Sequence, residues 1–455
     1  MKSEYFIFET PKPKQEEYKQ VFQKKDTIEM ATIIPRRTES TESGTTHRDN
    51  ADDVLPYTVT VSSEDKDEQI KNVSKELCPF LRDFPNDKLS VKPLTGGLSN
   101  ELFVVSSACN QSSGKRKCVL VRLHPSNINA ENTIVDRDVE NNVCAWLSSQ
   151  HVGPIYYGRF RNGRVEEYYP NHISLSYKEM PLVGPSHIAP IMAHFHSLQI
   201  PRHLLTYKSS AIMNSMQSTE RGDIFVRAQT WLNMAENLTN AENQKAVDML
   251  NRLKKDWSWL QDALHEAPNS EEPSSSTLAK TFLRQNVFAH MDMQSQNLLR
   301  NANQKIDPES SPPMALDCPL QVIDFEYAGF NPRAVDMANT FCEHCNMNNI
   351  KADYEAEYPS VEVQNAFLKS YIQQTLVYTQ DSSNLNYLKE SIDDLDFLAA
   401  ARHEIGRYTL VSHISWAIWS IVQSTLSDID FDYIKYAQHR MDGFEYMKGR
   451  FSLCS

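Results

Sequence analysis

The sequence predicts a bilobal α+β fold, in which a small β-rich N-terminal lobe precedes a larger, mostly helical C-terminal lobe. Two observations predict it. Runs rich in β-branched and aromatic residues occur between residues 89 and 170, and helical periodicity dominates after Pro190. A polar insert with two loop-and-strand units, at residues 288–299 and 320–327, interrupts the helices. The chain of 455 residues is long enough to bury a large core without disulfides or a structural metal.

We expect three parts along the chain. Residues 1–75 are poor in periodic apolar residues and include a charged, hydroxyl-rich run, so they are expected to form a mostly disordered, polar tail. Residues 76–170 are expected to form the N-lobe, and residues 171–455 the C-lobe. Two polar, Ser/Pro-rich stretches, 266–277 and 301–319, are expected to be surface loops.

The elements of each lobe follow from hydrophobic patterning. In the N-lobe, strands are expected at 101–106 and 118–123, a helix at 135–149, and a strand that leads into a linker at 163–170. In the C-lobe, apolar residues at helical spacing predict helices over residues 191–198, 224–238, 241–263, 361–375, 395–423 and 431–448.

The composition excludes several classes of function. The 46 basic and 59 acidic side chains give a net charge of −13, which argues against nucleic acid as the main partner and is compatible with a cationic ligand or a metal-bound nucleotide. No run of about 20 apolar residues is present, so no membrane span is expected, and the first residues do not resemble a secretory signal. The eight cysteines form no framework, which predicts reduced thiols and a cytoplasmic location. The pair Cys342 and Cys345 has no matching second pair, so a structural zinc site is not expected.

The first segment that points to chemistry runs from Thr95 to Asn100, just before a predicted strand. Its paired glycines, Gly96 and Gly97, would let backbone N–H groups approach a phosphate closely, and Ser99 and Asn100 add donors. Paired glycines before a strand are also typical of an ordinary turn, so this segment alone does not decide the function.

Two further segments are more specific when taken together. Asp292 is followed five residues later by Asn297, which is the layout of a kinase catalytic loop: the aspartate takes or orients the proton of an attacking hydroxyl, and the asparagine ligates Mg²⁺. Asp324 ends an apolar strand 32 residues after Asp292, where a second Mg²⁺ ligand would reach the phosphates. Either segment alone would fit a solvated turn, but the pair predicts a phosphotransferase.

With these segments in order, the sequence resembles the choline/ethanolamine kinase family from about Leu89 to Phe451. The matching motifs lie at residues 94–100, 119–123, 153–158, 163–167, 292–297, 323–331, 341–343 and 415–423. The family has a protein-kinase-like fold and transfers the γ-phosphoryl group of ATP to the hydroxyl of choline or ethanolamine. The resemblance therefore implies ATP and Mg²⁺ as cofactors, a small-molecule acceptor and a role in phospholipid biosynthesis.

The resemblance also gives roles to the matching residues. Asp292 would be the catalytic base, and the Mg²⁺ ligands would be Asn297, Asp324 and Glu326. Glu140 would orient the arginine that contacts the ATP phosphates, and Glu167 would lie at the hinge beside the adenine. The full set of expected ATP-binding residues is Gly96, Gly97, Leu98, Ser99, Asn100, Arg122, Glu140 and Glu167.

The acceptor pocket has to recognise a trimethylammonium group, which has no N–H to donate, through aromatic faces and an acidic field. Trp416 and Trp419 are three residues apart and share a helical face. The resemblance places them with Tyr327 and Tyr436 in an aromatic box and lets Glu343 supply the negative field. Without the resemblance, a tryptophan pair at this spacing would be interpreted as core packing.

The sequence departs from the family at two places. Met291 stands where the family usually has Asn, and residues 344–349 lack the expected aromatic and acidic side chains. The main hypothesis is an ATP:choline phosphotransferase. The alternatives are an ethanolamine kinase, a catalytically impaired pseudokinase with a binding role, and an aminoglycoside-type phosphotransferase, which the Trp416/Trp419 segment disfavours. Family members are commonly dimers, so a homodimer is also expected, although no feature of the sequence decides it.

Overall fold

The computed structural model describes both lobes as a series of segments separated by gaps. The described residues are 59–94, 100–108, 117–124, 134–205, 223–264, 274–308, 310, 318–347, 352–379, 385, 387–427 and 429–451. The chain divides into a unit of residues 1–46 and a unit of residues 47–455, and all described residues belong to the second unit.

The N-lobe is built on a five-stranded antiparallel sheet with the strand order β1-β2-β3-β5-β4. The strands are β1 (Leu89–Leu94), β2 (Glu101–Ser107), β3 (Cys118–Leu123), β4 (Tyr156–Phe160) and β5 (Gly163–Glu167). Helix α3 (Arg137–Ser149) lies between β3 and β4 in the sequence, and the Asp136 side chain caps its N-terminus. The strands predicted at 101–106 and 118–123 and the helix predicted at 135–149 are therefore confirmed, as β2, β3 and α3.

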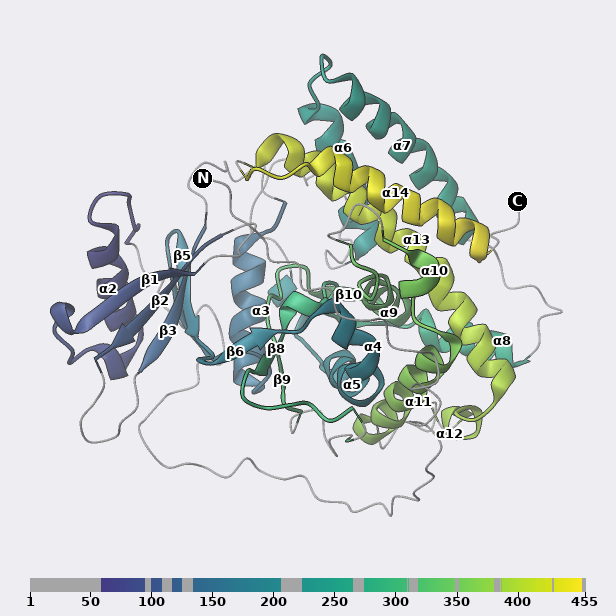
Figure 1. Cartoon of the computed structure of the whole chain (residues 1–455), viewed down its shortest axis with the longest axis horizontal. Coiled ribbons are helices and arrows are strands. Elements are labelled where there is room, and N and C mark those ends of the chain that lie inside the picture. The colour runs from purple at the N-terminus through teal and green to yellow at the C-terminus, as the bar shows by residue number, and fades with distance from the viewer. Residues whose placement is uncertain are drawn as a thin grey trace. The chain divides into compact units, whose positions relative to one another are not determined.

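A further helix, α2 (Lys66–Leu77), lies beside β1, β2 and β3 (Figure 1). It buries Ile70, Val73 and Leu77, which are spaced so that they share one face, against the N-lobe strands. The polar tail expected over residues 1–75 therefore has to be shortened, because these residues carry enough apolar surface to order a helix on the sheet. Residues 1–58 lie outside the described residues.

The chain passes from the N-lobe to the C-lobe between β5 and β6 (His172–Ser174). Strand β6 pairs with β8 (Leu298–Asn301), which pairs with β9 (Leu320–Val322) in a three-stranded sheet. Strands β7 (Asn286–Ala289) and β10 (Gly329–Pro332) form a separate antiparallel pair. These short strands flank the loops in which the predicted catalytic and metal-binding residues lie.

The rest of the C-lobe is helical, as the periodicity predicted. Its α-helices are α4 (Met180–Val183), α5 (Ala189–Ser197), α6 (Ile224–Leu238), α7 (Gln244–Leu264), α8 (Ser274–Leu283), α9 (Arg333–Cys342), α10 (Tyr354–Glu357), α11 (Val361–Tyr378), α12 (Tyr387–Ser391), α13 (Leu395–Leu426) and α14 (Tyr433–Arg450). Helix α8 begins inside the stretch 266–277, which was expected to be a loop.

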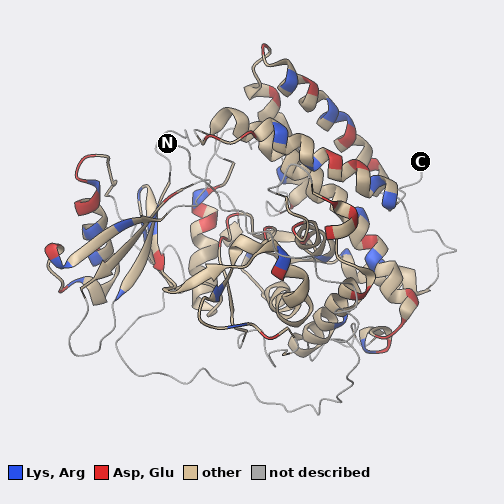
Figure 2. Cartoon of the chain, in the orientation of Figure 1, with Lys and Arg blue, Asp and Glu red and all other residues tan. Residues whose placement is uncertain are grey.

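Helix α13 is the centre of this lobe. It packs against α6, α7, α8, α9 and α14 and buries residues on all of its sides, as is typical of a core helix (Figure 1). Basic and acidic residues are interspersed along α7, on the outside of the lobe (Figure 2). Among the helices of the described ranges, none has the length and apolar character needed to cross a membrane.

Candidate active site

The predicted catalytic loop connects β7 to β8. Asn297 Nδ2 donates hydrogen bonds to the Asp292 carbonyl oxygen (2.9 Å) and to Asp292 Oδ2 (2.8 Å), so the two residues expected to act together are in contact. His290 Nδ1 accepts a hydrogen bond from the backbone N–H of Asp292 (3.2 Å), and its Nε2 lies 3.1 Å from the carbonyl oxygen of Ile323. His290 therefore ties the catalytic loop to the strand that leads to Asp324.

A residue that the sequence analysis missed, Asp336 on α9, holds the backbone of this loop. Its two carboxylate oxygens accept hydrogen bonds from the N–H groups of His290 (3.0 Å) and Met291 (2.8 Å). Met291 has a φ of 68°, a left-handed conformation that costs a non-glycine residue about 1–3 kcal/mol. Asp336 is fully buried and is itself hydrogen-bonded to His196 on α5 (3.0 Å). An aspartate within an apolar helical run was the only signal of this role in the sequence.

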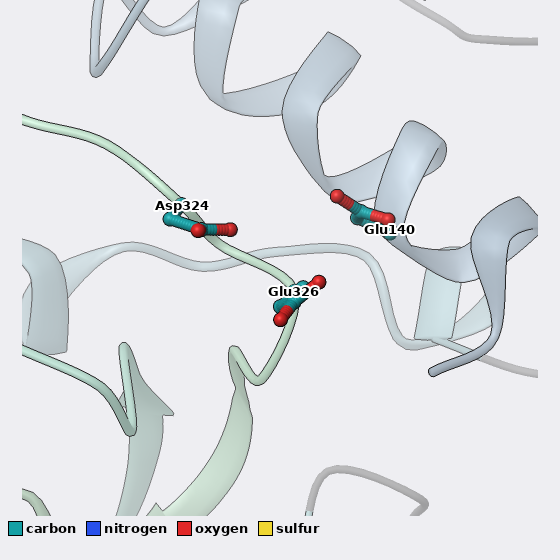
Figure 3. A group of neighbouring side chains, drawn as sticks. All are labelled: Glu140, Asp324 and Glu326. Carbon is teal, nitrogen blue, oxygen red and sulfur yellow. The ribbon is translucent and has the colours of Figure 1, made fainter. Parts of the chain in front are cut away.

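Three carboxylates meet where the N-lobe and the C-lobe face each other. Glu140 projects from α3, and Asp324 and Glu326 from the segment that follows β9 (Figure 3). Each offers an oxygen, and these oxygens lie within 4.8 Å of one another. Asp324 Oδ1 is buried and accepts no hydrogen bond from the described residues. Because carboxylate oxygens are the ligands that Mg²⁺ prefers, the cluster fits a divalent cation.

A network of buried ion pairs connects this cluster to the N-lobe sheet. Arg122 on β3 pairs with Glu166 (3.3 Å) and approaches Asp324 (3.9 Å). Arg164 pairs with Glu140 (2.5 Å) and, through Nε, with Glu166 (2.7 Å). The expected orientation of Arg122 by Glu140 is therefore indirect, since Arg164 and Glu166 lie between them. The sequence analysis gave no role to Arg164 or Glu166, although their alternation on β5 places them on the same face of the sheet.

Arg137 joins the two lobes at the same place. It donates to Glu140 (2.7 Å) and to Glu326 (3.0 Å). Burial and the neighbouring carboxylates of Asp324 and Glu140 nevertheless raise the pKa of Glu326 to about 7, against its ordinary value of 4.5. Glu326 therefore lacks enough positive charge from the protein alone, whereas, despite burial, Arg164 and Arg137 hold the pKa of Glu140 below its ordinary value.

Asp292 lies in the same negative field. Burial, followed by the charges of Glu343, Asp324 and Glu326, raises its pKa well above the usual range, and the hydrogen bond from Asn297 offsets only part of this rise. A carboxylate with a raised pKa is a stronger base, which suits it to accept a proton from a hydroxyl group.

The expected nucleotide contacts are only partly within the described residues. Gly96, Gly97, Leu98 and Ser99 lie outside them. The side chain of Asn100, which precedes β2, has its Oδ1 3.0 Å from Nδ1 of His124. Glu167 ends β5 at the crossing between the lobes, where its Oε2 accepts a hydrogen bond from the N–H of Ile155 (3.1 Å). This position is the one expected for a hinge residue.

Three of the four expected aromatic residues form one cluster. The rings of Tyr327 and Trp416 are 5.1 Å apart between centroids, and those of Trp416 and Trp419 are 5.6 Å apart. Trp419 Nε1 donates to the Tyr327 hydroxyl (3.0 Å), and Trp416 Nε1 donates to Asn339 Oδ1 (2.8 Å). Tyr327 is buried, but both tryptophans are partly exposed to solvent.

The fourth aromatic residue, Tyr436, joins this cluster through Arg440 on α14, which the sequence analysis also missed. Arg440 donates to Glu343 Oε1 (2.6 Å) and to the Tyr436 hydroxyl (2.9 Å). Its guanidinium carbon lies 5.3 Å from the ring centroid of Tyr436 and 6.0 Å from that of Trp416. The charge of Glu343 is therefore already paired with a cation of the protein.

The two departures from the family have a structural explanation. The loop uses the backbone of Met291, whose N–H donates to Asp336 and whose carbonyl accepts from Asn339 (3.2 Å). A change of the side chain at this position therefore preserves the hydrogen bonds of the loop. After Glu343, the described residues His344 and Cys345 are buried rather than exposed toward the aromatic cluster.

Comparison with known proteins gives consistent matches over most of the chain. A sequence profile described as choline/ethanolamine kinase matches residues 91–445. The chain is 27% identical to a probable choline kinase 2 of Arabidopsis thaliana over 393 residues, which cover 84% of this chain and 92% of that protein. It is 29% identical to a choline/ethanolamine kinase of Rattus norvegicus over 377 residues, which cover 80% and 82%. The crystal structure of a choline kinase from Cryptosporidium parvum has a similar fold, with a TM-score of 0.60 at 23% identity, and covers 84% of this chain and 95% of that one. The predicted bilobal, protein-kinase-like fold is thus confirmed.

Proposed function

The chain belongs to the choline/ethanolamine kinase family, and from this premise we propose that it uses ATP and Mg²⁺ to phosphorylate the hydroxyl group of choline. One observation carries the proposal: the aromatic cluster and the acidic site are continuous. Tyr327, which contacts Trp416, directly follows Glu326 of the carboxylate cluster. Met291, which precedes Asp292, lines a small cavity together with Tyr327 and Trp416, so the catalytic loop and the aromatic rings lie next to each other. This cavity of about 10 Å³ has room for about one water molecule, so it marks the contact between loop and rings and is not itself the acceptor pocket. A small cation held by the aromatic rings would thus lie beside the catalytic loop.

The residues that would hold Mg²⁺ are Asp324, Glu326 and Asn297. The amide nitrogen of Asn297 is bonded to Asp292, which leaves the amide oxygen as the ligand atom. When bound, the metal supplies positive charge that stabilises the transferring phosphoryl group. Arg122 on the N-lobe, which approaches Asp324, would place a further positive charge beside the same phosphoryl group. The glycine loop at residues 96–99 is proposed to cover the phosphates.

Asp292 is proposed as the base that receives the proton of the acceptor hydroxyl. Its side chain is fixed by Asn297, and its backbone by the hydrogen bond to His290. Fixing the base in this way lowers the entropy cost of bringing it to the hydroxyl. Asp292 is hydrogen-bonded to Asn297, and Arg122 approaches Asp324 (3.9 Å). The presence of both pairs supports catalysis rather than a role in binding alone.

The acceptor side favours choline over ethanolamine. A primary ammonium needs several hydrogen-bond acceptors beside the rings. There, Asn339 Oδ1 already accepts from Trp416 and from Ser412 (2.7 Å), and the charge of Glu343 is paired with Arg440. A trimethylammonium group needs only aromatic faces and a negative field, which Trp416 and Trp419 and the nearby carboxylates supply. The cytoplasmic location and the homodimer expected from the sequence stay predictions.

The test is ADP release by the purified full chain with ATP and Mg²⁺, with choline and ethanolamine supplied separately. We expect faster release with choline. Asp292→Asn is expected to abolish turnover while nucleotide binding persists, and near-normal turnover in that variant would refute the assignment of the base. Trp416→Ala is expected to raise KM for choline far more than KM for ATP, because it removes a ring face from the acceptor side only. Equal changes in both constants would indicate a packing role, and no ADP release with either acceptor would favour the pseudokinase.

A further inference from the structure

A chain of buried polar side chains leads from the catalytic loop into the core of the C-lobe. It begins at Asp336 on α9, the residue that holds the backbone of the loop. His196 Nε2, on α5, lies 3.0 Å from an oxygen of Asp336, and His196 Nδ1 lies 2.6 Å from the hydroxyl of Tyr371 on α11. The chain ends at Arg333, the first residue of α9, whose Nη1 lies 2.5 Å from the same hydroxyl. Four side chains from three helices are therefore joined in one line.

The chemistry of these groups fixes the position of each proton along the chain. Both oxygens of Asp336 accept hydrogen bonds from N–H groups of the loop, so it acts as an ionised carboxylate and has no proton to donate. His196 Nε2 must therefore carry the proton of its bond to Asp336, which leaves Nδ1 of a neutral ring as an acceptor. Tyr371 donates its hydroxyl proton to this Nδ1, and its oxygen accepts from Arg333, which can only donate. The donors thus follow one direction, from Arg333 to Asp336.

The ring of His196 is neutral, as this order of donors requires. Burial lowers its pKa, the hydrogen bond and the charge of Asp336 oppose this effect, and the charge of Arg333 lowers the pKa further, so that it lies below its ordinary value of 6.5. A protonated ring would have to donate from Nδ1 and could not accept the proton of Tyr371. Arg333 therefore supports the chain in two ways, since its N–H binds the tyrosine hydroxyl and its charge favours the neutral ring.

The whole chain is shielded from bulk solvent. The side chains of His196 and Asp336 are inaccessible to solvent, and Tyr371 is fully buried. Arg333, which is 7% exposed, is held by its contact with the Phe282 ring, whose centroid lies 4.8 Å from the guanidinium carbon. A hydrogen bond broken inside this chain leaves buried polar atoms unpaired, which makes each link costly to lose. Because the core is closely packed, a shift of one member is also passed on to the next.

We propose that Tyr371 and Arg333 are positioning residues, which keep the catalytic loop in its strained conformation by fixing the orientation of His196. Met291 has a φ of 68°, and this conformation persists only while Asp336 holds its N–H. Without the Tyr371 hydroxyl, Nδ1 of His196 loses its donor, and the ring no longer presents its Nε2 proton to Asp336 in a fixed orientation. The catalytic base directly follows Met291, so a loop that relaxes moves the base away from the acceptor hydroxyl. The effect on turnover rests on the proposed function, and the effect on the loop does not.

The first test is hydrogen–deuterium exchange of the full chain without substrates, followed by mass spectrometry of peptides that cover residues 288–293. In Tyr371→Phe, we expect the amide hydrogens of the loop to exchange at least about 10-fold faster, as the loss of one partner of a buried hydrogen bond implies. Arg333→Met is a second variant and should show the same change. Tyr358→Phe is the matched control, because Tyr358 is also buried and its hydroxyl has no hydrogen-bond partner among the described residues. It should exchange like the original chain.

The second test measures phosphorylation of choline with ATP and Mg²⁺. Tyr371→Phe is expected to lower kcat about 10-fold and to change KM for ATP and for choline less than about 2-fold, because the loop positions the base and not the substrates. Arg333→Met should behave in the same way, and Arg333→Lys, which keeps a positively charged donor, should recover part of kcat. A fall in kcat that Tyr358→Phe shares, or a change confined to KM, would contradict the positioning role.

A double variant tests whether the effect passes through His196. His196→Gln keeps an N–H donor for Asp336 at the place of Nε2 but has no atom at the place of Nδ1. In this background, Tyr371→Phe should change loop exchange and kcat less than about 2-fold, because the link that it removes is already absent. The same effect of Tyr371→Phe in both backgrounds, or loop exchange like that of Tyr358→Phe, would overturn the proposal. If the original chain does not phosphorylate choline, the proposed function fails, and the exchange rates still decide whether Tyr371 holds the loop.

Discussion

The most informative perturbation of the carboxylate cluster is Glu326→Gln. The structure gives Glu326 a pKa of about 7 in place of 4.5, so the folded chain binds this proton more tightly than the unfolded chain. The stabilisation from this proton is fully present below pH 4.5 and is lost as the pH rises through about 7. At about 1.4 kcal/mol per pH unit, this rise in pKa corresponds to roughly 3 kcal/mol.

Glutamine has nearly the same shape and does not titrate. The difference in unfolding free energy between Glu326→Gln and the original chain should therefore shift in favour of the variant by about 2–3 kcal/mol between pH 5 and pH 8. Comparing the two pH values cancels any packing change that does not depend on pH. The side chain of Glu326 is only 7% exposed, so solvent screening reduces the effect little.

The assay is equilibrium urea unfolding followed by circular dichroism at both pH values, with a chelator present. Glu76→Gln, an exposed glutamate on α2, is the control and should show no such shift. Mg²⁺ at pH 8 should then stabilise the original chain more than Glu326→Gln, because the metal favours the ionised carboxylate. A pH-independent difference would show that Arg137 alone keeps Glu326 ionised, and the argument for a cation in this cluster would fail.

Two more substitutions test how the loops are held. Gly153 has a φ of +73°, and a Cβ there would lie 2.6 Å from the Phe325 ring. Gly153→Ala should therefore lower the free energy of unfolding by about 1–3 kcal/mol, measured by thermal unfolding, and reduce kcat. The control is Gly449→Ala, which has nothing within 4 Å of the added Cβ and should be neutral or slightly stabilising. If both alanine variants behave alike, the contact with Phe325 does not matter. Asp336→Asn keeps the shape of the side chain but loses one acceptor for the N–H groups of the loop. We expect kcat to fall about 10–100-fold while KM for ATP changes little. A change confined to KM would contradict the positioning role of Asp336.

The parts of the site that could be predicted are those encoded over short distances in the sequence. Asp292 and Asn297 are five residues apart and bond to each other, and Trp416 and Trp419 are three apart on one helix. Local spacing is enough in both cases, because a tight loop or one helical face fixes the geometry. Asp324 could be predicted because an apolar strand ends there.

The parts that could not be predicted depend on packing between distant segments. Arg137 contacts Glu326 across 189 positions, and Arg440 contacts Glu343 across 97. A charged residue on a predicted helix is more often solvated, so the sequence gives no reason to pair it with a particular carboxylate. Helix α2 was missed for a similar reason. A short, mostly polar helix is marginally stable by itself, and its contact with the N-lobe sheet is what stabilises it.

The two lobes contribute to the site in different ways. Met291 and Asp324 both have a φ of 68°, and such strain persists only where the surroundings hold it. What holds Met291 is Asp336, in the C-lobe, and what holds Asp324 is its neighbour Phe325, which packs against Phe195 (5.9 Å between centroids). The geometry of the catalytic groups is therefore built into the C-lobe.

The N-lobe supplies charge rather than shape. Arg122 and Arg137 reach Asp324 and Glu326 from it, and Glu140 adds the third carboxylate of the cluster. The distance between the lobes therefore sets how many positive charges face the carboxylates, and hence how strongly the cluster attracts a cation. Despite burial, Arg164 and Arg137 lower the pKa of Glu140, but the pKa of Glu326 is raised to about 7 even with Arg137 in contact. The shortage of positive charge is therefore at Glu326, which is where a bound Mg²⁺ would add most to stability.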